Sequence, residues 1–202
     1  MTPPQEDPTD VRPWIRKNSL SGPKLRSEMD AHEASVLRSL VASVLGMLED
    51  RAGQAPQDDL AQLTGLRTGN ATPPDNPAVR RLLPDFHRPD QDSATHADDE
   101  SADLNGAMRS LHEPNIIDTK LAAGAMILRT VPETGGRVVL TPEQAESWLY
   151  ALNDVRLALG ATLDIDDDTP EVLDDDDPRA PHLDVYHWLT WVQDSLVQAL
   201  QP

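Results

Sequence analysis

Carboxylates are concentrated in one short stretch of the chain, and carboxylate oxygens are ligands that calcium prefers in proteins. Residues 164–177 read DIDDDTPEVLDDDD, with nine acidic side chains and no basic one. Asp164, Asp166 and Asp168 have the spacing of the first three ligands of an EF-hand calcium loop. Three later residues break that pattern: Thr169 where the sharp turn needs glycine, Val172 at the ninth position and Asp175 where the bidentate glutamate belongs. We expect a solvated acidic loop that binds divalent cations weakly at most, and we assign no metal site.

The histidines show no metal-binding pattern either. None of the six forms a pair four residues apart, and no HExxH motif occurs. His182 and His187 are five residues apart, which places them on different faces of a helix. The motifs G-x-S-x-G, G-x-G-x-x-G and the Walker loop are also missing from the sequence. We predict a protein that is not an enzyme, with no catalytic residues and no cofactor; an unrecognised enzyme or metal-binding protein stays as an alternative.

The charge and the cysteine content exclude further classes. The chain contains no cysteine, which excludes disulfides, thiolate nucleophiles and redox cysteines. Its 35 acidic and 17 basic side chains give a net charge of −18, whereas tight binding to duplex DNA relies on basic side chains that neutralise phosphates. We therefore expect no direct tight nucleic-acid binding and a protein partner instead. Solubility alone would also explain the acidity.

The N-terminus and the hydropathy pattern bear on the compartment. No run approaches the roughly 20 apolar residues that span a bilayer, and the first ten residues, MTPPQEDPTD, lack the basic and apolar regions of a signal peptide. We expect a cytoplasmic protein.

One basic and apolar segment stands out in the acidic chain. Residues 80–88, RRLLPDFHR, contain the only phenylalanine, Phe86. In one interpretation Leu82, Leu83 and Phe86 hold a loop on the core while the arginines pair with carboxylates. In the other the segment docks a protein partner, because arginine and aromatic side chains are favoured at the centre of interfaces. The candidate partner-binding residues here are Arg80, Arg81, Phe86 and Arg88.

A second aromatic segment lies near the C-terminus. Residues 186–191, YHWLTW, hold three of the chain's six Trp and Tyr side chains. On a helix such residues pack into a core or reach an interface. Trp188 is the candidate for partner binding here.

The elements that position these residues are mainly helical. A strand at 137–140 leads into a helix whose Thr141 and Gln144 have the spacing of a capping box, and Asp30 and Glu33 repeat that arrangement before a helix that extends to about Asp50. Residues 14–17 and 24–26 predict a hairpin, to which 137–140 adds a third strand. Further helices are predicted at 57–63, 77–83, 103–112, 115–131 and from 181 or 182 to 200.

This pattern predicts a mainly α fold, an orthogonal or bundle-like helical domain with a small two- to three-stranded β element. We expect residues 1–12 to form a disordered lead and residues 13–202 to form a single domain. Mobile loops are expected at about 68–78, 89–102 and 164–180.

Taken in order, several segments resemble an actinobacterial family first catalogued as a domain of unknown function and later named as oxidative-stress regulators. The resemblance covers roughly residues 14–200. Its carriers are GPKLRS at 22–27, EASVLR at 33–38, RRLLPD at 80–85, RSLHEP at 109–114, GRVVLT at 136–141, NDVRLALG at 153–160 and YHWLT at 186–190.

The resemblance implies a cytoplasmic, non-enzymatic regulator that acts on transcription through protein contacts, with a sigma factor or RNA polymerase, at genes of cysteine synthesis. The family's redox sensing is associated with a CxxxC pair, which this chain lacks. A response to oxidants would then need another route, such as one of the five methionines or a separate sensor. An acidic adaptor unrelated to transcription stays as an alternative function.

Overall fold

The structure, a computed structural model, describes residues 12–19, 22–56, 67–87, 97–166, 168–174 and 176–201, with the side chains of 97–100 left out. Outside these ranges lie the predicted helix at 57–63, the candidate residue Arg88 and residues 89–96 of the loop predicted at 89–102. Nearly all of the lead at 1–12 lies outside them as well; its last residue, Arg12, begins the first strand.

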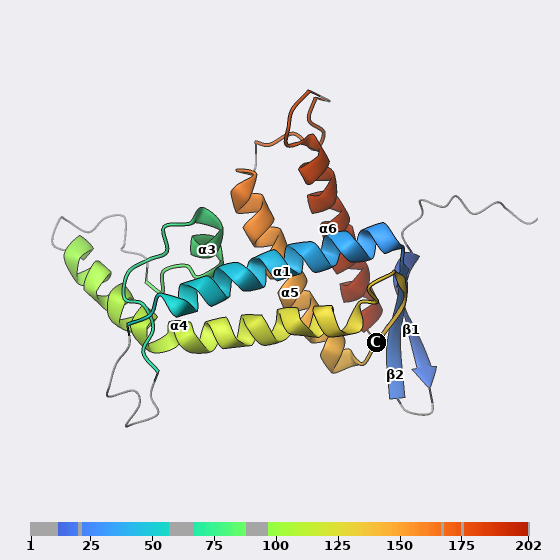
Figure 1. The fold of residues 1–202 in the computed structure, drawn as a ribbon, viewed down its shortest axis with the longest axis horizontal. Coiled ribbons are helices and arrows are strands. Elements are labelled where there is room, and N and C mark those ends of the chain that lie inside the picture. The colour runs from blue at the N-terminus through green and yellow to red at the C-terminus, as the bar shows by residue number, and fades with distance from the viewer. Residues whose placement is uncertain are drawn as a thin grey trace, which may run out of the picture.

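The chain folds into long helices with one small sheet, which confirms the predicted mainly α class with a β element. The described elements are, in order, β1 (Arg12–Ser19), β2 (Gly22–Met29), α1 (Ala31–Gly53), α3 (Pro77–Leu82), α4 (Ala97–Thr130), β3 (Gly136–Leu140), α5 (Pro142–Thr162) and α6 (Ala180–Leu200). Helices α1 and α4 pack along the long axis, and α5 and α6, which contact each other, cross it steeply (Figure 1). The orthogonal or bundle-like packing expected from the sequence stays a prediction.

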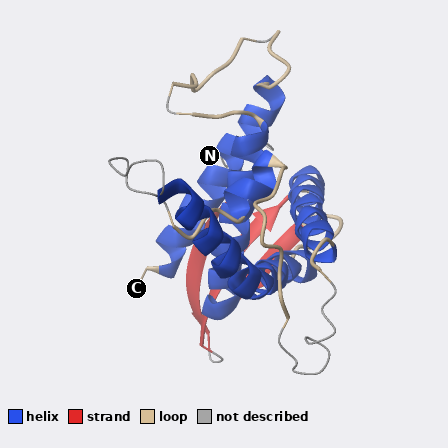
Figure 2. Cartoon of the chain, turned by 90° about the vertical axis from the view of Figure 1, so that its left-hand side faces the viewer, coloured by secondary structure: helices blue, strands red, loops and turns tan. Residues whose placement is uncertain are grey.

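The sheet lies at one end of the molecule and has the order β1-β2-β3, with both pairs antiparallel (Figure 1). This confirms the predicted hairpin and its third strand. Trp14, Leu25 and Val138 are buried in the core, where helices α5 and α6 pack against the strands. Figure 2 shows helices lying against the strands. Side chains alternate between the two faces of a strand. The next residue on each strand, Ile15, Arg26 or Val139, therefore lies on the opposite, outer face of the sheet.

Both predicted capping boxes are present. The Asp30 carboxylate accepts from the Glu33 N–H at 2.8 Å, and the Glu33 carboxylate accepts from the Asp30 N–H at 2.8 Å. Thr141 and Gln144 make the same reciprocal pair at the start of α5. These bonds satisfy donors that have no partner within a helix, so both helices begin where the sequence predicts.

Helix α4 corrects the sequence prediction of two helices that meet at Pro114. The helix is continuous from Ala97 to Thr130 with Pro114 inside it. Proline has no N–H, so the Ser110 carbonyl one turn earlier loses its helical partner. The Gly69 N–H donates to that carbonyl at 2.7 Å and replaces the missing bond. A backbone group from a distant loop therefore allows the helix to continue.

Residues 97–102 of the loop predicted at 89–102 are helical instead, because α4 begins at Ala97. Asp and Glu near the start of a helix interact favourably with its dipole, and residues 98–100 read DDE. The polar composition that indicated a loop therefore suits a first helical turn as well. The loops predicted at 68–78 and 164–180 lie mainly between helices, before α3 and between α5 and α6.

The core lies where the helices meet the sheet. Trp148 of α5 is fully buried and packs edge-on against Trp14 of β1, with ring centroids 5.3 Å apart. The Trp148 Nε1–H donates to the Thr130 hydroxyl at 2.8 Å. Gly124 brings α4 close to α1, because a methyl group in its place would lie 2.6 Å from Leu45. In the part of the chain that the structure describes, no helix is long and apolar enough to cross a membrane.

Candidate protein-interaction site

The basic segment predicted to dock a partner begins on the short helix α3. Asn76 caps this helix by accepting from the Ala78 and Val79 N–H groups, and Pro77 takes the first helical position. Arg80 and Arg81 in its last turn are exposed. The two arginines therefore stand on the surface at a fixed helical spacing.

Leu82 and Leu83 are buried, as one interpretation of the sequence expects, whereas Phe86, which that interpretation also placed on the core, is 40% exposed. Leu82 and Leu83 belong to the hydrophobic core. The Arg80 Nε–H donates to the Pro74 carbonyl at 2.9 Å, which holds its side chain along the preceding loop. Arg81 is exposed although Leu82 and Leu83 beside it are buried, so it is accessible to a partner. Docking of a partner at this segment stays a prediction.

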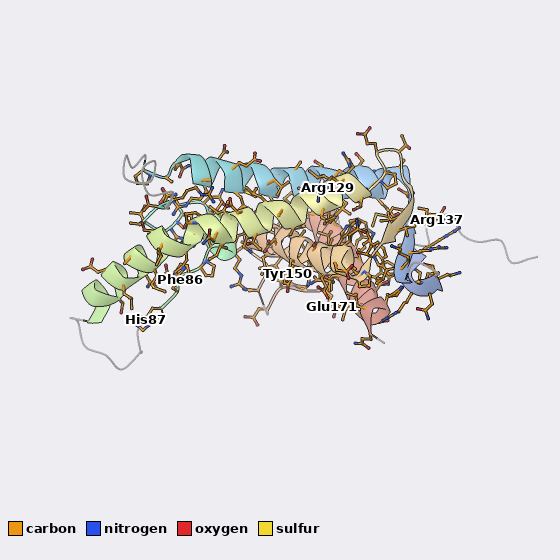
Figure 3. All side chains as sticks on the ribbon, turned by 90° about the horizontal axis from the view of Figure 1, so that it is seen from below. Phe86, His87, Arg129, Arg137, Tyr150 and Glu171 are labelled. Carbon is orange, nitrogen blue, oxygen red and sulfur yellow. The ribbon has the colours of Figure 1, made fainter. Side chains whose placement is uncertain are left out.

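Phe86 lies on the surface beside helix α4 (Figure 3). Its side chain is 40% exposed, and its ring centre lies 5.8 Å from that of His112. The Asn105 side chain accepts from the Phe86 and His87 N–H groups at 2.9 and 2.8 Å and donates to the His87 carbonyl at 2.8 Å. An aromatic ring thus stands half-exposed on a backbone held by three hydrogen bonds.

A buried ionic cluster lies beneath this segment. Arg109 of α4, 1% exposed, donates to the Leu83 carbonyl at 3.0 Å and to Asp85 at 2.6 Å. It also donates to Glu113, one helical turn later, at 3.2 Å. Arg109 therefore connects the end of α3 and the residues before Phe86 to α4.

Glu113 accepts hydrogen bonds from three side chains. Arg51, in the last turn of α1, donates to it at 2.8 and 3.1 Å in a bidentate pair. Asn70 donates to the same carboxylate at 3.3 Å and to the Arg51 carbonyl at 3.0 Å. Together with Arg109, one carboxylate thus compensates two buried guanidinium groups, and this joins α1, α4 and the loop before α3.

Sequence reasoning missed this cluster. Arg109 and Glu113 are four residues apart on a helix, and this spacing indicates an ion pair. The position of both residues on the inward side of that helix would have indicated that the pair is buried. Neither spacing nor composition indicates that Arg51 and Asn70 meet them, because those residues come from elements far away in the sequence.

A cavity of about 760 Å³ lies beside the cluster, between the last turns of α1 and residues 70–76. Its wall includes Arg51, Asn70 and the exposed Asp50 and Asp75. Arg51 is already bound to Glu113 and to the Thr72 carbonyl at 2.6 Å. Gln54, Thr72 and Asn76 also line this cavity, and the Asn76 side chain already caps α3.

Trp188, the second candidate, lies on α6, away from the basic segment on α3. It is half-buried against the core, and its indole Nε1–H is buried and finds no acceptor within the described residues. Trp191, one turn further on, is 39% exposed. Of the two tryptophans, Trp191 therefore presents more of its ring to the surface, and the role of Trp188 in partner binding stays a prediction.

The acidic candidates Asp164, Asp166 and Asp168 are exposed in the loop after α5. Asp166 accepts from the Thr169 hydroxyl at 2.8 Å and from the Asp168 N–H at 3.1 Å. The Thr169 hydrogen bond is the main reason why the pKa of Asp166 lies below its ordinary value. Within the described ranges, no three His, Asp or Glu side chains are gathered closely enough to hold a metal ion.

Another ion pair connects α4 to α5. Lys120 donates to Asp154 at 2.6 Å, with Asp154 only 4% exposed. Burial raises the pKa of Asp154 above its ordinary value, and the hydrogen bond from Lys120 opposes part of that rise. The pair therefore joins two helices that pack against each other.

The elements described above extend over nearly the whole chain, and the same span matches one family. The chain belongs to the family described as a domain of unknown function, DUF2017, whose model matches residues 12–200. This confirms the resemblance stated from the sequence.

The named relatives are mycobacterial. The "Oxidative stress regulator AosR" of Mycobacterium tuberculosis and that of Mycobacterium bovis are each 47% identical to this chain over 192 residues, which cover 94% of this chain and 88% of the relative. The "Putative oxidative stress regulator AosR" of Mycobacterium leprae is 46% identical over the same length. No solved structure matches the chain.

Proposed function

We propose that this protein is a non-enzymatic, cytoplasmic regulator of the response to oxidative stress. It acts on transcription, at genes of cysteine synthesis, through contacts with a sigma factor or RNA polymerase. The observation that carries the proposal is the 47% identity, over nearly all of both chains, to proteins named as oxidative stress regulators.

The surface at the end of α3 supports the protein-contact part of the proposal. Arg81 is exposed, Phe86 is 40% exposed, and both are attached to a backbone that buried groups hold in place. A pre-organised surface loses less conformational entropy on binding than a loose one. Arg80, Arg81, Phe86 and Trp188 are the residues to which we assign partner contact.

An oxidant signal reaches this regulator without cysteine chemistry, since the chain has none. Routes that need no cysteine include the methionine thioethers and a separate sensor protein. Of the methionines, Met29 is buried at 4% exposure, whereas Met47, Met108 and Met126 are partly exposed. If an oxidant reacts directly with this chain, we propose that it oxidises the thioethers of these three partly exposed methionines.

Transcript profiling of a strain that lacks the gene tests the proposal. Cells with and without the gene receive a sublethal dose of hydrogen peroxide. We expect the transcripts of cysteine synthesis to respond in the wild type and to lose most of that response in the deletion strain. A deletion strain with the wild-type transcript response would contradict the proposal.

The exposed acidic loop at 164–177 favours a second candidate, an adaptor for basic client proteins outside transcription. Both candidates predict a protein partner, but they differ in its identity. Enrichment of protease or ribosomal components in a pull-down would favour the adaptor, and enrichment of transcription proteins would favour the regulator.

A further inference from the structure

The outer face of the three-stranded sheet carries a basic surface on this acidic protein. The strand register places its side chains in three rows: Arg12, Glu28 and Arg137; Ile15, Arg26 and Val139; and Lys17 opposite Lys24. Five cations and one anion give this face a local charge of +5 − 1 = +4, in a chain whose net charge is −18. We call these eight residues the basic sheet face.

The basic sheet face lies at the opposite end of the molecule from Phe86. Figure 3 shows Arg137 projecting beside the strands at one end, and Phe86 and His87 near the other. The face is therefore distinct from the surface at the end of α3, formed by Arg80, Arg81 and Phe86, to which partner contact was assigned above. We call that surface the α3 surface. The helices α5 and α6 cover the other side of the same sheet.

Arg26 lies at the centre of this face with an unsatisfied donor. Ile15 and Val139 are its cross-strand neighbours on the two sides. Its Nε–H is buried and has no hydrogen-bond acceptor within the described residues. Buried donors normally have a partner, and a guanidinium matches a carboxylate in a bidentate pair. Because Arg26 is only partly buried, a carboxylate at the surface is the ligand whose chemistry fits its guanidinium.

The two aliphatic neighbours add an apolar contribution. Ile15 is 47% exposed and Val139 is 42% exposed, on either side of the Arg26 stem. A shallow hollow of about 220 Å³ extends over this face and includes Arg12, Ile15, Arg26 and Arg137 in its wall. Exposed aliphatic side chains between cations fit a ligand that has apolar groups between its carboxylates.

We propose that the basic sheet face binds an acidic peptide segment of a partner protein, in which carboxylates alternate with aliphatic side chains. One carboxylate pairs with Arg26, others lie near Lys17, Lys24 and Arg137, and the aliphatic groups cover Ile15 and Val139. This inference adds a second contact surface and a partner chemistry to the proposed function, but its test does not depend on transcription.

Two observations favour an acidic peptide over a phosphate polymer or an anionic membrane. The rest of the chain is strongly acidic and repels an extended polyanion, whereas a short segment meets only the local positive face. The exposed side chains between the cations are aliphatic, and not the aromatic platforms on which unpaired bases stack.

Fluorescence anisotropy with the purified full chain tests the proposal. The probe is a short labelled peptide of alternating Glu and Val. Arg26→Glu should weaken its binding about tenfold or more, because a charge-assisted bidentate pair is replaced by repulsion. Arg26→Lys keeps the positive charge but loses the two parallel N–H donors of the guanidinium. It should therefore weaken peptide binding less than Arg26→Glu does. Arg129→Glu, at an exposed position on α4 outside this face, is the matched control and should leave binding unchanged.

Nuclear magnetic resonance of the wild-type protein provides a readout that needs no variant. Addition of the peptide should shift the Arg26 Nε–H signal strongly, and a peptide of alternating Glu and Ser should bind more weakly. No binding, equal loss with Arg129→Glu, or an unchanged Arg26 signal would overturn the proposal. Tighter binding of charge-matched single-stranded DNA or phosphatidylglycerol vesicles would overturn it as well. None of these results changes the transcript response that tests the regulatory function.

Discussion

Glu113 accepts hydrogen bonds from Arg51, Arg109 and Asn70 at once, and it is 1% exposed. A buried charge is tolerated only where it is paired, so this carboxylate determines whether two guanidinium groups can stay inside the protein. Because Arg109 also holds the backbone of Leu83, the cluster connects the interior to the residues of the α3 surface.

Glu113→Gln should lower the free energy of unfolding by about 3–5 kcal/mol, because it leaves the buried Arg51 without a compensating charge and Arg109 with only the half-exposed Asp85. Chemical denaturation followed by circular dichroism measures this. Glu133→Gln is the control: Glu133 lies 3.8 Å from Arg38 and its side chain is 86% exposed, so we expect a change within about 0.5 kcal/mol. Equal effects of the two substitutions would contradict the role of the cluster.

Asp154 should make the stability depend on pH in the direction opposite to that of an ordinary paired carboxylate. Its pKa is raised in the folded state by burial, so the folded protein binds the proton more tightly than the unfolded chain does. Stability contributed by this group is present below its ordinary value of 3.8 and is lost as the pH rises through the raised pKa.

Asp154→Asn removes this titration while leaving an acceptor for Lys120. The free energy of unfolding of the wild type, minus that of Asp154→Asn, should therefore fall as the pH rises through this window. Urea denaturation of both proteins across that pH range measures the difference. A difference that rises with pH would show that the ion pair with Lys120 outweighs the cost of burial.

At the residue scale, the sequence drew attention to the arginines and Phe86 because they break an acidic pattern, but it left open whether Phe86 packs on the core or faces a partner. It did not predict the ionic cluster, whose members are separated along the chain. Arg51 lies at the end of a helix, where a basic residue is ordinarily explained by the helix dipole. Only the packing of α4 against α1 shows that its guanidinium is buried.

At the scale of elements, α4 shows how a tertiary contact overrides a local signal. Pro114 predicts the end of a helix, yet the Gly69 N–H binds the Ser110 carbonyl and the helix continues. A methyl group at Gly69 would lie 2.8 Å from the Pro114 ring, so only glycine allows this approach. The capping boxes of α1 and α5, in contrast, are local and could be predicted.

Gly69→Ala should destabilise the protein by about 1–3 kcal/mol, because the added methyl group overlaps Pro114 and displaces the donor to Ser110. Thermal unfolding measures the loss. Gly46→Ala in α1 has no atom within 4 Å of the added carbon and should be neutral or stabilising by up to about 1 kcal/mol. If Gly69→Ala were as stable as Gly46→Ala, the account of the continuous helix would be wrong.

At the scale of the whole molecule, the structure separates two basic surfaces on an acidic protein. One lies at the end of α3, and the other is the basic sheet face at the opposite end of the long axis (Figures 1 and 3). Composition predicted the acidity and a protein partner. It did not predict the basic sheet face, because its cations come from three strands whose register sets their neighbours.

The paired substitution Arg80→Glu and Arg81→Glu should weaken partner capture severalfold and change the free energy of unfolding by no more than about 1 kcal/mol. Both side chains are exposed, and the substitution removes the hydrogen bond from Arg80 to the Pro74 carbonyl. Partner capture is measured by pull-down and stability by denaturation. Unchanged capture would remove these residues from the interface.

The central claim, regulation through contact with transcription proteins, is tested most directly by pull-down from native lysate followed by mass spectrometry. The wild-type chain, the Arg80→Glu and Arg81→Glu variant, and the Arg129→Glu control serve as baits. We predict that a sigma factor or RNA polymerase subunits are enriched by the wild type and the control, and less by the double variant. A wild-type bait that enriches no transcription protein would contradict the account.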